Sequence, residues 1–279
     1  MERDVVIVGA GIAGASLAHF LAEAGQSSVL LVEREARPAH HASGRSAEAL
    51  VEVELGDPIW QGLIDESAAF FRRPPPAVAR RSLLLPTGII NLMDEGERAV
   101  LADAVPDLRR RGIAVDILEP ADARARLPWL SERDFAGAMH LPHSGRLAVG
   151  ALVAGYLGAA EARGATLWLG TEVLAVETTA GRVSAVETTR GRVGCRLLVC
   201  AAGAWAGGLA RMAGATAIEL TPMRRTVVSF DAPPGFATEG LPLVSYDARG
   251  VYVATEGAGL IASPMDEEPV AACDAQADP

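Results

Sequence analysis

The sequence predicts an α/β fold in which a Rossmann-like unit with a doubly wound parallel sheet is interleaved with an α+β unit. Three observations carry this prediction. The first is a strand–helix–strand pattern around a glycine-rich turn at residues 4–32, and the second is a pair of adjacent segments, 175–183 and 185–193, that differ at one position. The third is a different pattern of predicted strands and helices between residues 74 and 143. A helical crossover between buried strands is typical of a parallel sheet. We therefore expect one unit at 1–80 with 144–216 and the other at 81–143 with 217–279.

The N-terminal segment alternates strand and helix patterns. Asp4–Val8 is an apolar run typical of a buried strand, and glycines at 9, 11 and 14 follow it directly. Apolar side chains then recur at helical spacing as far as Gly25, a residue type that ends helices. Ser28–Val32 is a second buried strand. This order predicts a βαβ unit with parallel strands.

The segment after the proline triplet at 74–76 is predicted to begin the inserted unit. Its expected elements are strands at 81–85, 89–93 and 113–118 and helices at 95–111, interrupted at Pro106, and 121–127. Because Pro86-Thr87-Gly88 are turn residues, the first two strands are expected to form a β-hairpin.

The remaining chain is expected to complete both units. A helix is predicted at Leu147–Arg163, and the paired segments with Gly181 and Gly191 at their corners predict a β-meander. Further strands are expected at 196–200, 225–230, 251–254 and 260–262. The acidic stretch 266–279 shows no pattern of a helix or strand that would complete either unit.

Composition excludes several classes of function. The 25 basic residues are all arginine, so lysine-dependent chemistry (Schiff bases, pyridoxal phosphate, the P-loop) is excluded. With 35 acidic residues the net charge is −10, which argues against nucleic-acid partners. Three cysteines make no disulfide framework, and the longest apolar runs are too short to span a membrane. The chain is therefore predicted to be cytoplasmic. The histidines show no metal-ligand spacing, and no metal is expected.

The glycine-rich turn indicates a phosphate-binding cradle. Its Gly-x-Gly-x-x-Gly spacing permits a tight turn, close approach of a pyrophosphate to the backbone, and close packing of helix on strand. Glu33 lies 19 residues beyond Gly14, where a carboxylate accepts the ribose hydroxyls and repels a 2′-phosphate. These features predict an ADP-containing dinucleotide other than NADP, without separating NAD from FAD.

Three blocks resemble the D-amino-acid oxidase-like family of FAD-dependent oxidoreductases, which includes glycine oxidase, sarcosine oxidase and D-amino-acid dehydrogenase. The blocks are 9–14 with Glu33-Arg34, the loop 41–47 (HASGRSA), and 200–205 (CAAGAW); a weaker similarity covers 263–267. The resemblance implies FAD as cofactor. With the residue types, it assigns the cofactor contacts to Gly9, Gly11, Ile12, Ala13, Gly14, Glu33, Arg34, Ser43, Gly44, Arg45, Ser46, Ala47, Val173, Ala202, Gly203 and Trp205. A histidine near His40-His41 attaches the flavin covalently in some relatives; polar surface is the alternative.

The resemblance implies oxidation of an amine or amino acid, with a hydride passing to the flavin and the resulting imine hydrolysed by water. Candidate substrate contacts are Arg224, Arg225, Arg249, Tyr246 and Tyr252, and no catalytic residue is assigned. Some oxidases of the family place a lysine over the flavin, so its absence favours a dehydrogenase.

Two departures from the family pattern leave alternatives open. The stretch 48–54 carries glutamates where sarcosine oxidase-like members bring in an arginine, which would suit a cationic amine if these glutamates face the pocket. Relatives also continue beyond the last similar block, so we expect that the C-terminal part of the family fold is missing here. Either the chain is a fragment, or a partner chain supplies that part. The alternatives are a flavin-dependent 2-hydroxy-acid or polyol-phosphate dehydrogenase and a non-catalytic FAD-binding subunit.

Overall fold

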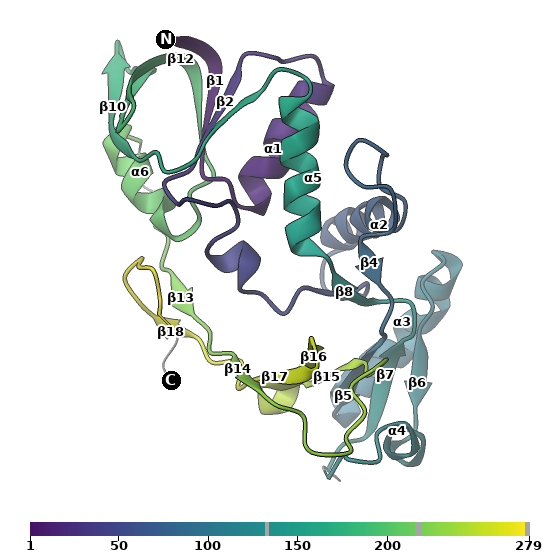
Figure 1. Cartoon of the computed structure of the whole chain (residues 1–279). Helices are drawn as coiled ribbons and strands as arrows, with labels where there is room; N and C mark the ends of the chain where they lie inside the picture. The colour runs from purple at the N-terminus through teal and green to yellow at the C-terminus, as the bar shows by residue number, and fades with distance from the viewer. Residues whose placement is uncertain (132–133, 216–218, 277–279) are drawn as a thin grey trace.

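The first unit of the computed structural model is built on a largely parallel sheet (Figure 1). The structure describes residues 1–131, 134–215 and 219–276, so the predicted boundary at 216/217 lies outside the described residues. The sheet has the order β10-β11-β12-β1-β2-β9. Its strands are β1 (Glu2–Val8), β2 (Val29–Val32), β9 (Thr166–Trp168), β10 (Val173–Thr179), β11 (Arg182–Thr188) and β12 (Gly191–Cys200). β1 pairs in parallel with both β2 and β12, which confirms the predicted βαβ unit.

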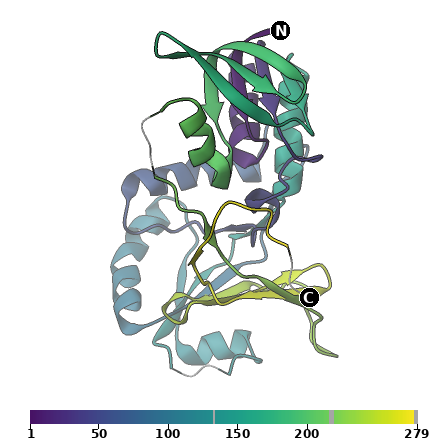
Figure 2. The same ribbon diagram turned by 90° about the vertical axis from the view of Figure 1, so that its left-hand side faces the viewer.

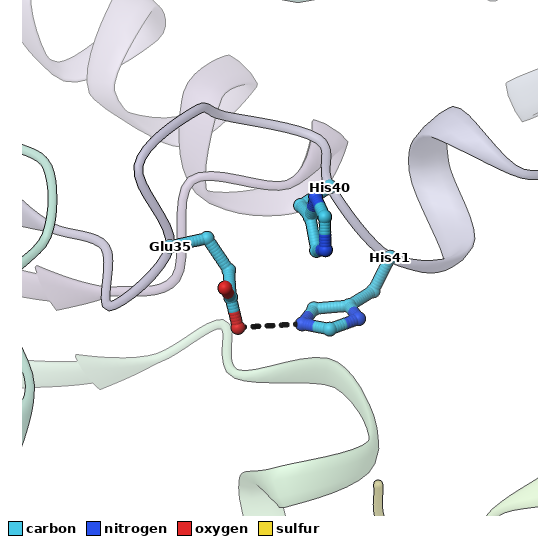
Figure 3. A group of neighbouring side chains, drawn as sticks. All are labelled: Glu35, His40 and His41. Carbon is cyan, nitrogen blue, oxygen red and sulfur yellow. Dashed lines mark hydrogen bonds and ion pairs between the residues drawn. The ribbon is translucent and has the colours of Figure 1, made fainter. Parts of the chain in front are cut away.

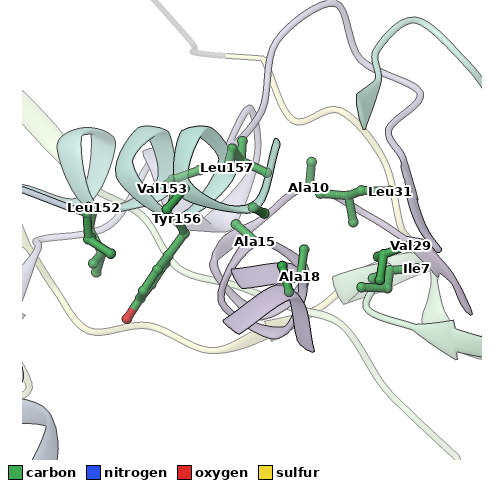
Figure 4. Packing of buried hydrophobic residues seen from close by; sticks show 14 of the residues in the cluster. Ile7, Ala10, Ala15, Ala18, Val29, Leu31, Leu152, Val153, Tyr156 and Leu157 are labelled. Atoms are coloured by element: carbon green, nitrogen blue, oxygen red, sulfur yellow. The ribbon is translucent and has the colours of Figure 1, made fainter. Parts of the chain in front are cut away.

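Alternation along β1 separates the two faces of this sheet. Val5 and Ile7 pack against α1 (Ile12–Glu23) and α5 (Val149–Glu161), whereas Val6 packs against the meander. Figure 4 shows how small residues of α1, Ala15 and Ala18, let the two helices approach each other over the sheet. The predicted meander is confirmed by the antiparallel pairs β10–β11 and β11–β12.

The second unit is a mixed sheet with the order β14-β17-β16-β15-β5-β7-β6. Its strands are β5 (Ile89–Met93), β6 (Asp116–Leu118), β7 (Gly137–Leu141), β14 (Val228–Phe230), β15 (Leu243–Tyr246), β16 (Val251–Glu256) and β17 (Gly259–Ser263). One face packs on α3 (Glu95–Arg110) and the other on α4 (Pro120–Arg126). Successive residues of β5 point to opposite faces, Ile89 toward α3 and Ile90 toward α4.

A small sheet with the order β3-β8-β4 lies between the units, beside α2 (Pro58–Arg72). Its strands are β3 (Ala49–Leu50), β4 (Leu84–Leu85) and β8 (Gly145–Leu147). β4 pairs with β8, while β5 pairs with β7 and β15, so the predicted hairpin of 81–85 with 89–93 is wrong. Gly88, at φ +84°, turns the chain out of one sheet and into the other.

Other differences from the sequence prediction are local. Pro106 lies inside a continuous α3, whose capping box at Asp94 and Glu97 secures its first turn. Of the predicted strand 225–230 only residues 228–230 form a strand, β14, and β13 (Met223–Arg224) precedes the predicted range. The predicted strand 196–200 is the last part of the longer β12. The acidic stretch contains β18 (Glu268–Pro269), which pairs with β13. The short helices are η1 (Ala42–Gly44), η2 (Gly203–Trp205), α6 (Ala206–Met212) and η3 (Asp247–Arg249). None of the helices described here combines the length and apolar character needed to cross a bilayer.

Candidate functional site

A cavity of about 1260 Å³ opens at the carboxyl ends of β1, β2 and β12. Ligands of open α/β sheets bind at this edge, because the loops that leave the strands diverge there. The loop 39–47 forms one wall, and β13 with the segment 270–276 forms another. In Figure 2 the yellow C-terminal segment crosses the space between the two units.

Glycine is required at two positions of the turn beneath the cavity. Gly9 has φ +107°, and a Cβ there would lie 2.4 Å from the carbonyl oxygen of Ala201. A Cβ on Gly14 would lie 1.9 Å from the carbonyl oxygen of Gly9. These distances are far inside van der Waals contact, so β1, β12 and α1 meet at this turn only because neither residue has a side chain. The resulting backbone surface is open to a pyrophosphate at the N-terminus of α1.

The Glu33 carboxylate is fixed at the end of β2 by backbone amides. One oxygen accepts from the Ala10 amide at 2.8 Å and the other from the Glu35 amide at 2.9 Å. A carboxylate oxygen accepts about two hydrogen bonds, so each retains capacity for a hydroxyl. The carboxylate lines the cavity beside the glycine turn, and the arrangement fits a ribose diol next to a pyrophosphate.

Trp205 contacts two residues of the loop after β2. The Arg34 guanidinium lies 3.9 Å from the centre of the Trp205 ring, and the His41 ring centre lies 4.6 Å from it. All three residues line the cavity. Trp205 therefore lies in the cavity wall, and its contact with the cofactor stays a prediction.

Glu35, His40 and His41 come close enough together to be compared with a metal site (Figure 3). His41 Nε2 lies 2.9 Å from Glu35 Oε1, and this hydrogen bond is the main cause that lowers the pKa of the Glu35 carboxyl. Arg34 donates to that same carboxylate oxygen, and Arg37 donates to Nδ1 of His40 at 3.0 Å. The closeness of Glu35, His40 and His41 was not predicted from the sequence. Because the charges of the neighbouring guanidinium groups oppose a bound cation, this closeness does not by itself indicate a metal centre.

Some residues of the loop 43–47 fix its position, and others face the cavity. Ser43 Oγ accepts from the Ile12 amide at 3.0 Å and so ties the loop to the first turn of α1. Arg45 donates to Asp274 Oδ1 and to the Ala275 carbonyl, both at 2.7 Å. Gly44 does not line the cavity; a Cβ there would lie 2.2 Å from the Ala39 carbonyl oxygen.

Most residues assigned to the cofactor share the cavity wall. Those lining it are Gly9, Gly11, Ile12, Ala13, Glu33, Arg34, Ser43, Arg45, Ser46, Ala47, Val173, Ala202, Gly203 and Trp205. Gly14 and Gly44 lie behind the wall and shape it.

The candidate substrate residues fall into two groups. Arg224, Arg225 and Tyr252 line the cavity. Arg224 is paired with Glu268 and Arg225 with Glu267, so neither guanidinium is free of a carboxylate.

Tyr246 and Arg249, which were also predicted to contact the substrate, lie outside this cavity. Tyr246 is buried among the residues beside α4 and donates its hydroxyl to the Asp134 carbonyl at 2.9 Å. Arg249 donates to the Asp134 carboxylate at 2.8 Å. Residues alternate along β15 and β16, so Tyr252 reaches the cavity whereas Tyr246 turns away from it.

The glutamates of the stretch 48–54 do not line the cavity. Glu48 pairs with Arg146 at 3.1 Å, and the buried Glu52 accepts from Arg72 at 2.6 Å and from the Ser144 hydroxyl at 2.7 Å. They hold the small sheet together, so the structure gives no support to a cation-binding role for them.

Comparison with known proteins agrees with this geometry. A family model described as "DAO: FAD dependent oxidoreductase" matches residues 4–279. FAD-dependent oxidoreductase domain-containing protein 1 of Bos taurus is 27% identical over 96% of this chain, which spans 63% of that protein. The mitochondrial pyruvate dehydrogenase phosphatase regulatory subunit of Mus musculus is 27% identical over 74% of this chain and 23% of its own length. The crystal structure of glycine oxidase from Geobacillus kaustophilus superposes with a TM-score of 0.77 at 27% identity, covering 96% of this chain and 72% of that one.

Proposed function

This chain belongs to the FAD-dependent oxidoreductase family, and we propose that it oxidises an amine or amino acid to an imine, which water then hydrolyses. The observation that carries the proposal is the cavity at the ends of β1, β2 and β12, where Glu33 stands beside a turn that only glycine can form. FAD, the cofactor of this family, supplies the two-electron acceptor when bound. The protein's own residues provide binding and orientation.

We propose that the cofactor is held from the first unit. The amides at the start of α1 face its diphosphate, and Glu33 accepts hydrogen bonds from its ribose. Trp205, which contacts Arg34 and His41, also lines the cavity and offers an aromatic surface to the same ligand. We propose that FAD contacts those of the assigned residues that line the cavity.

We propose that the substrate enters from the side of the second unit, where Tyr252 and Arg225 line the cavity. Tyr252 supplies a hydroxyl that can orient an amine, and a substrate carboxylate would compete with Glu267 for Arg225. On this proposal, residues 1–80 with 144–216 hold the cofactor and 81–143 with 217–279 the substrate.

A dehydrogenase is favoured over an oxidase. The chain has no lysine, so an ammonium group cannot promote reaction of a reduced flavin with oxygen. Electrons would then pass to another acceptor.

A second candidate is a non-catalytic FAD-binding subunit. It is favoured by the similarity to a regulatory subunit that matches 74% of this chain. Its distinguishing property is that bound flavin is never reduced by an amine.

A reconstitution experiment tests these proposals. The purified chain is mixed with FAD, freed of excess cofactor and examined for flavin absorption, and amines and amino acids are then added without oxygen. Loss of the oxidised-flavin bands supports amine oxidation, and oxygen or an artificial dye then identifies the electron acceptor. Bands that persist with amines but fade with a 2-hydroxy acid or a polyol phosphate would overturn the choice of substrate. Bands that no reductant of these classes removes favour the regulatory subunit, and no retained flavin contradicts both candidates.

A further inference from the structure

The segment Val270–Gln276, here called the tail segment, lies within the wall of the cofactor cavity. It leaves the second unit at β18, whose pairing with β13 is extended by a hydrogen bond from the Val270 amide to the Pro222 carbonyl. From there it runs to the loop that follows β2, more than two hundred residues away in the sequence. The tail segment therefore connects the two units within the cavity wall, and Figure 2 shows the yellow C-terminal segment between them.

Asp274 is the anchor of the tail segment. Its carboxylate accepts a charge-assisted hydrogen bond from Arg45 at 2.7 Å and lies 3.6 Å from ring nitrogens of both His40 and His41. Arg45 holds the backbone as well, through the Ala275 carbonyl. The Arg45 guanidinium is the main cause that lowers the pKa of Asp274, so the carboxylate is ionised near neutral pH.

Arg45 is the permanently charged group that Asp274 contacts. Arg45 belongs to the loop block that we propose to bind the cofactor, and it is a residue type suited to a diphosphate. One guanidinium cannot give its donors fully to a carboxylate and to a diphosphate in the same place. A diphosphate that takes the donors now used by Asp274 must therefore displace this carboxylate.

We infer that the tail segment is an intramolecular competitor of FAD, and that Asp274 must leave Arg45 when the cofactor binds. This inference rests on the proposed function, because it assumes that the cavity takes FAD. The tail segment keeps Arg45 paired in the free protein and raises the FAD concentration needed for loading.

The competition is tested by comparing FAD affinity in the full chain and in Asp274→Asn, with Asp103→Asn as the control. Asp103 is exposed on α3, so its variant makes the same change of charge away from the cavity. The asparagine keeps the size of the side chain but removes the charge that Arg45 binds. We expect the dissociation constant for FAD, from titration of flavin fluorescence, to fall about three- to tenfold in Asp274→Asn and to stay unchanged in Asp103→Asn.

A second measurement follows the tail segment itself. Hydrogen–deuterium exchange of the peptide that contains residues 270–276 should rise when FAD saturates the wild-type chain and should already be high in Asp274→Asn without FAD. Equal FAD affinity in all three proteins, or exchange that FAD leaves unchanged or slows, overturns the competition and leaves the proposed function standing. No FAD binding by any of them overturns both.

Discussion

Glu33→Gln is expected to weaken FAD binding by about ten- to a hundredfold. In the structure the two carboxylate oxygens already accept from the Ala10 and Glu35 amides, at 2.8 and 2.9 Å. Glutamine offers one accepting oxygen in place of two, and it carries no charge. At least one ribose hydroxyl then loses a charged acceptor, worth about 1.5–3 kcal/mol, and each 1.4 kcal/mol is about tenfold in affinity.

Glu33→Gln also changes the hydrogen bonds that the side chain accepts from the Ala10 and Glu35 amides. One of the two amides will face the glutamine NH₂ group, and an unsatisfied, partly buried amide costs about 1–3 kcal/mol. The free energy of unfolding of the cofactor-free protein, measured in urea, must therefore accompany the binding data. Glu161→Gln, an exposed change near the end of α5, controls for loss of charge alone.

The assay is a flavin fluorescence titration of both variants at a temperature where each is folded. Glu161→Gln should bind as the wild type does. If Glu33→Gln also binds FAD with unchanged affinity while its stability falls, the carboxylate only supports the loop, and the placement of the ribose beside it is refuted.

Three further predictions concern folding. Gly14→Ala should prevent the native turn and FAD retention together, since its Cβ would lie 1.9 Å from the Gly9 carbonyl oxygen; a variant that retains flavin absorption after gel filtration would contradict this. Leu101→Ala should lower the free energy of unfolding by about 2–5 kcal/mol, because this side chain is buried under the second sheet, whereas the exposed Val100→Ala should change it little in the same urea titration. Burial lowers the pKa of His19 below 6.5, so the folded state binds fewer protons than the unfolded state and stability should fall as the pH drops below about 6.5, flattening once the pH passes the folded-state pKa. Urea midpoints from pH 8 to pH 5 on the wild type and on His19→Leu should show a smaller decrease in the variant, and parallel curves would exclude this group.

The first unit could be predicted because its signals are local. The apolar run of β1 and the glycine spacing after it determine a strand, a turn and a helix within a short stretch, and no distant residue has to be known. Glu33 was predicted on the same basis, since its distance from the turn is set by the length of one helix and one strand. The part of α1 beyond Gly14, residues 15–23, and the four residues of β2 account for most of that distance.

The second unit was predicted less well because strand partners are a long-range property. Leu84–Leu85 and Ile89–Met93 have the pattern of a hairpin, but the strands that pair with them come from residues 137–147 and 243–245. The helix α2 was missed: its apolar Ile59, Trp60 and Leu63 are exposed, so the face that carries them does not mark a buried stripe.

The cavity also shows what composition alone does not reveal about an arginine-rich, acidic chain. Each arginine that lines the cavity in the described part of the chain is already paired with a carboxylate: Arg34 with Glu35, Arg45 with Asp274, Arg224 with Glu268 and Arg225 with Glu267. An anionic ligand therefore meets no unpaired guanidinium there, and where it takes the donors already in use it replaces a carboxylate that the chain itself supplies. Its affinity reports the difference between two ion pairs, and that difference is smaller than the stronger pair alone. Removing an acidic partner should consequently strengthen the binding of an anion that uses its arginine, and this is why Asp274 and Glu267, rather than the arginines, are the more informative residues to change first.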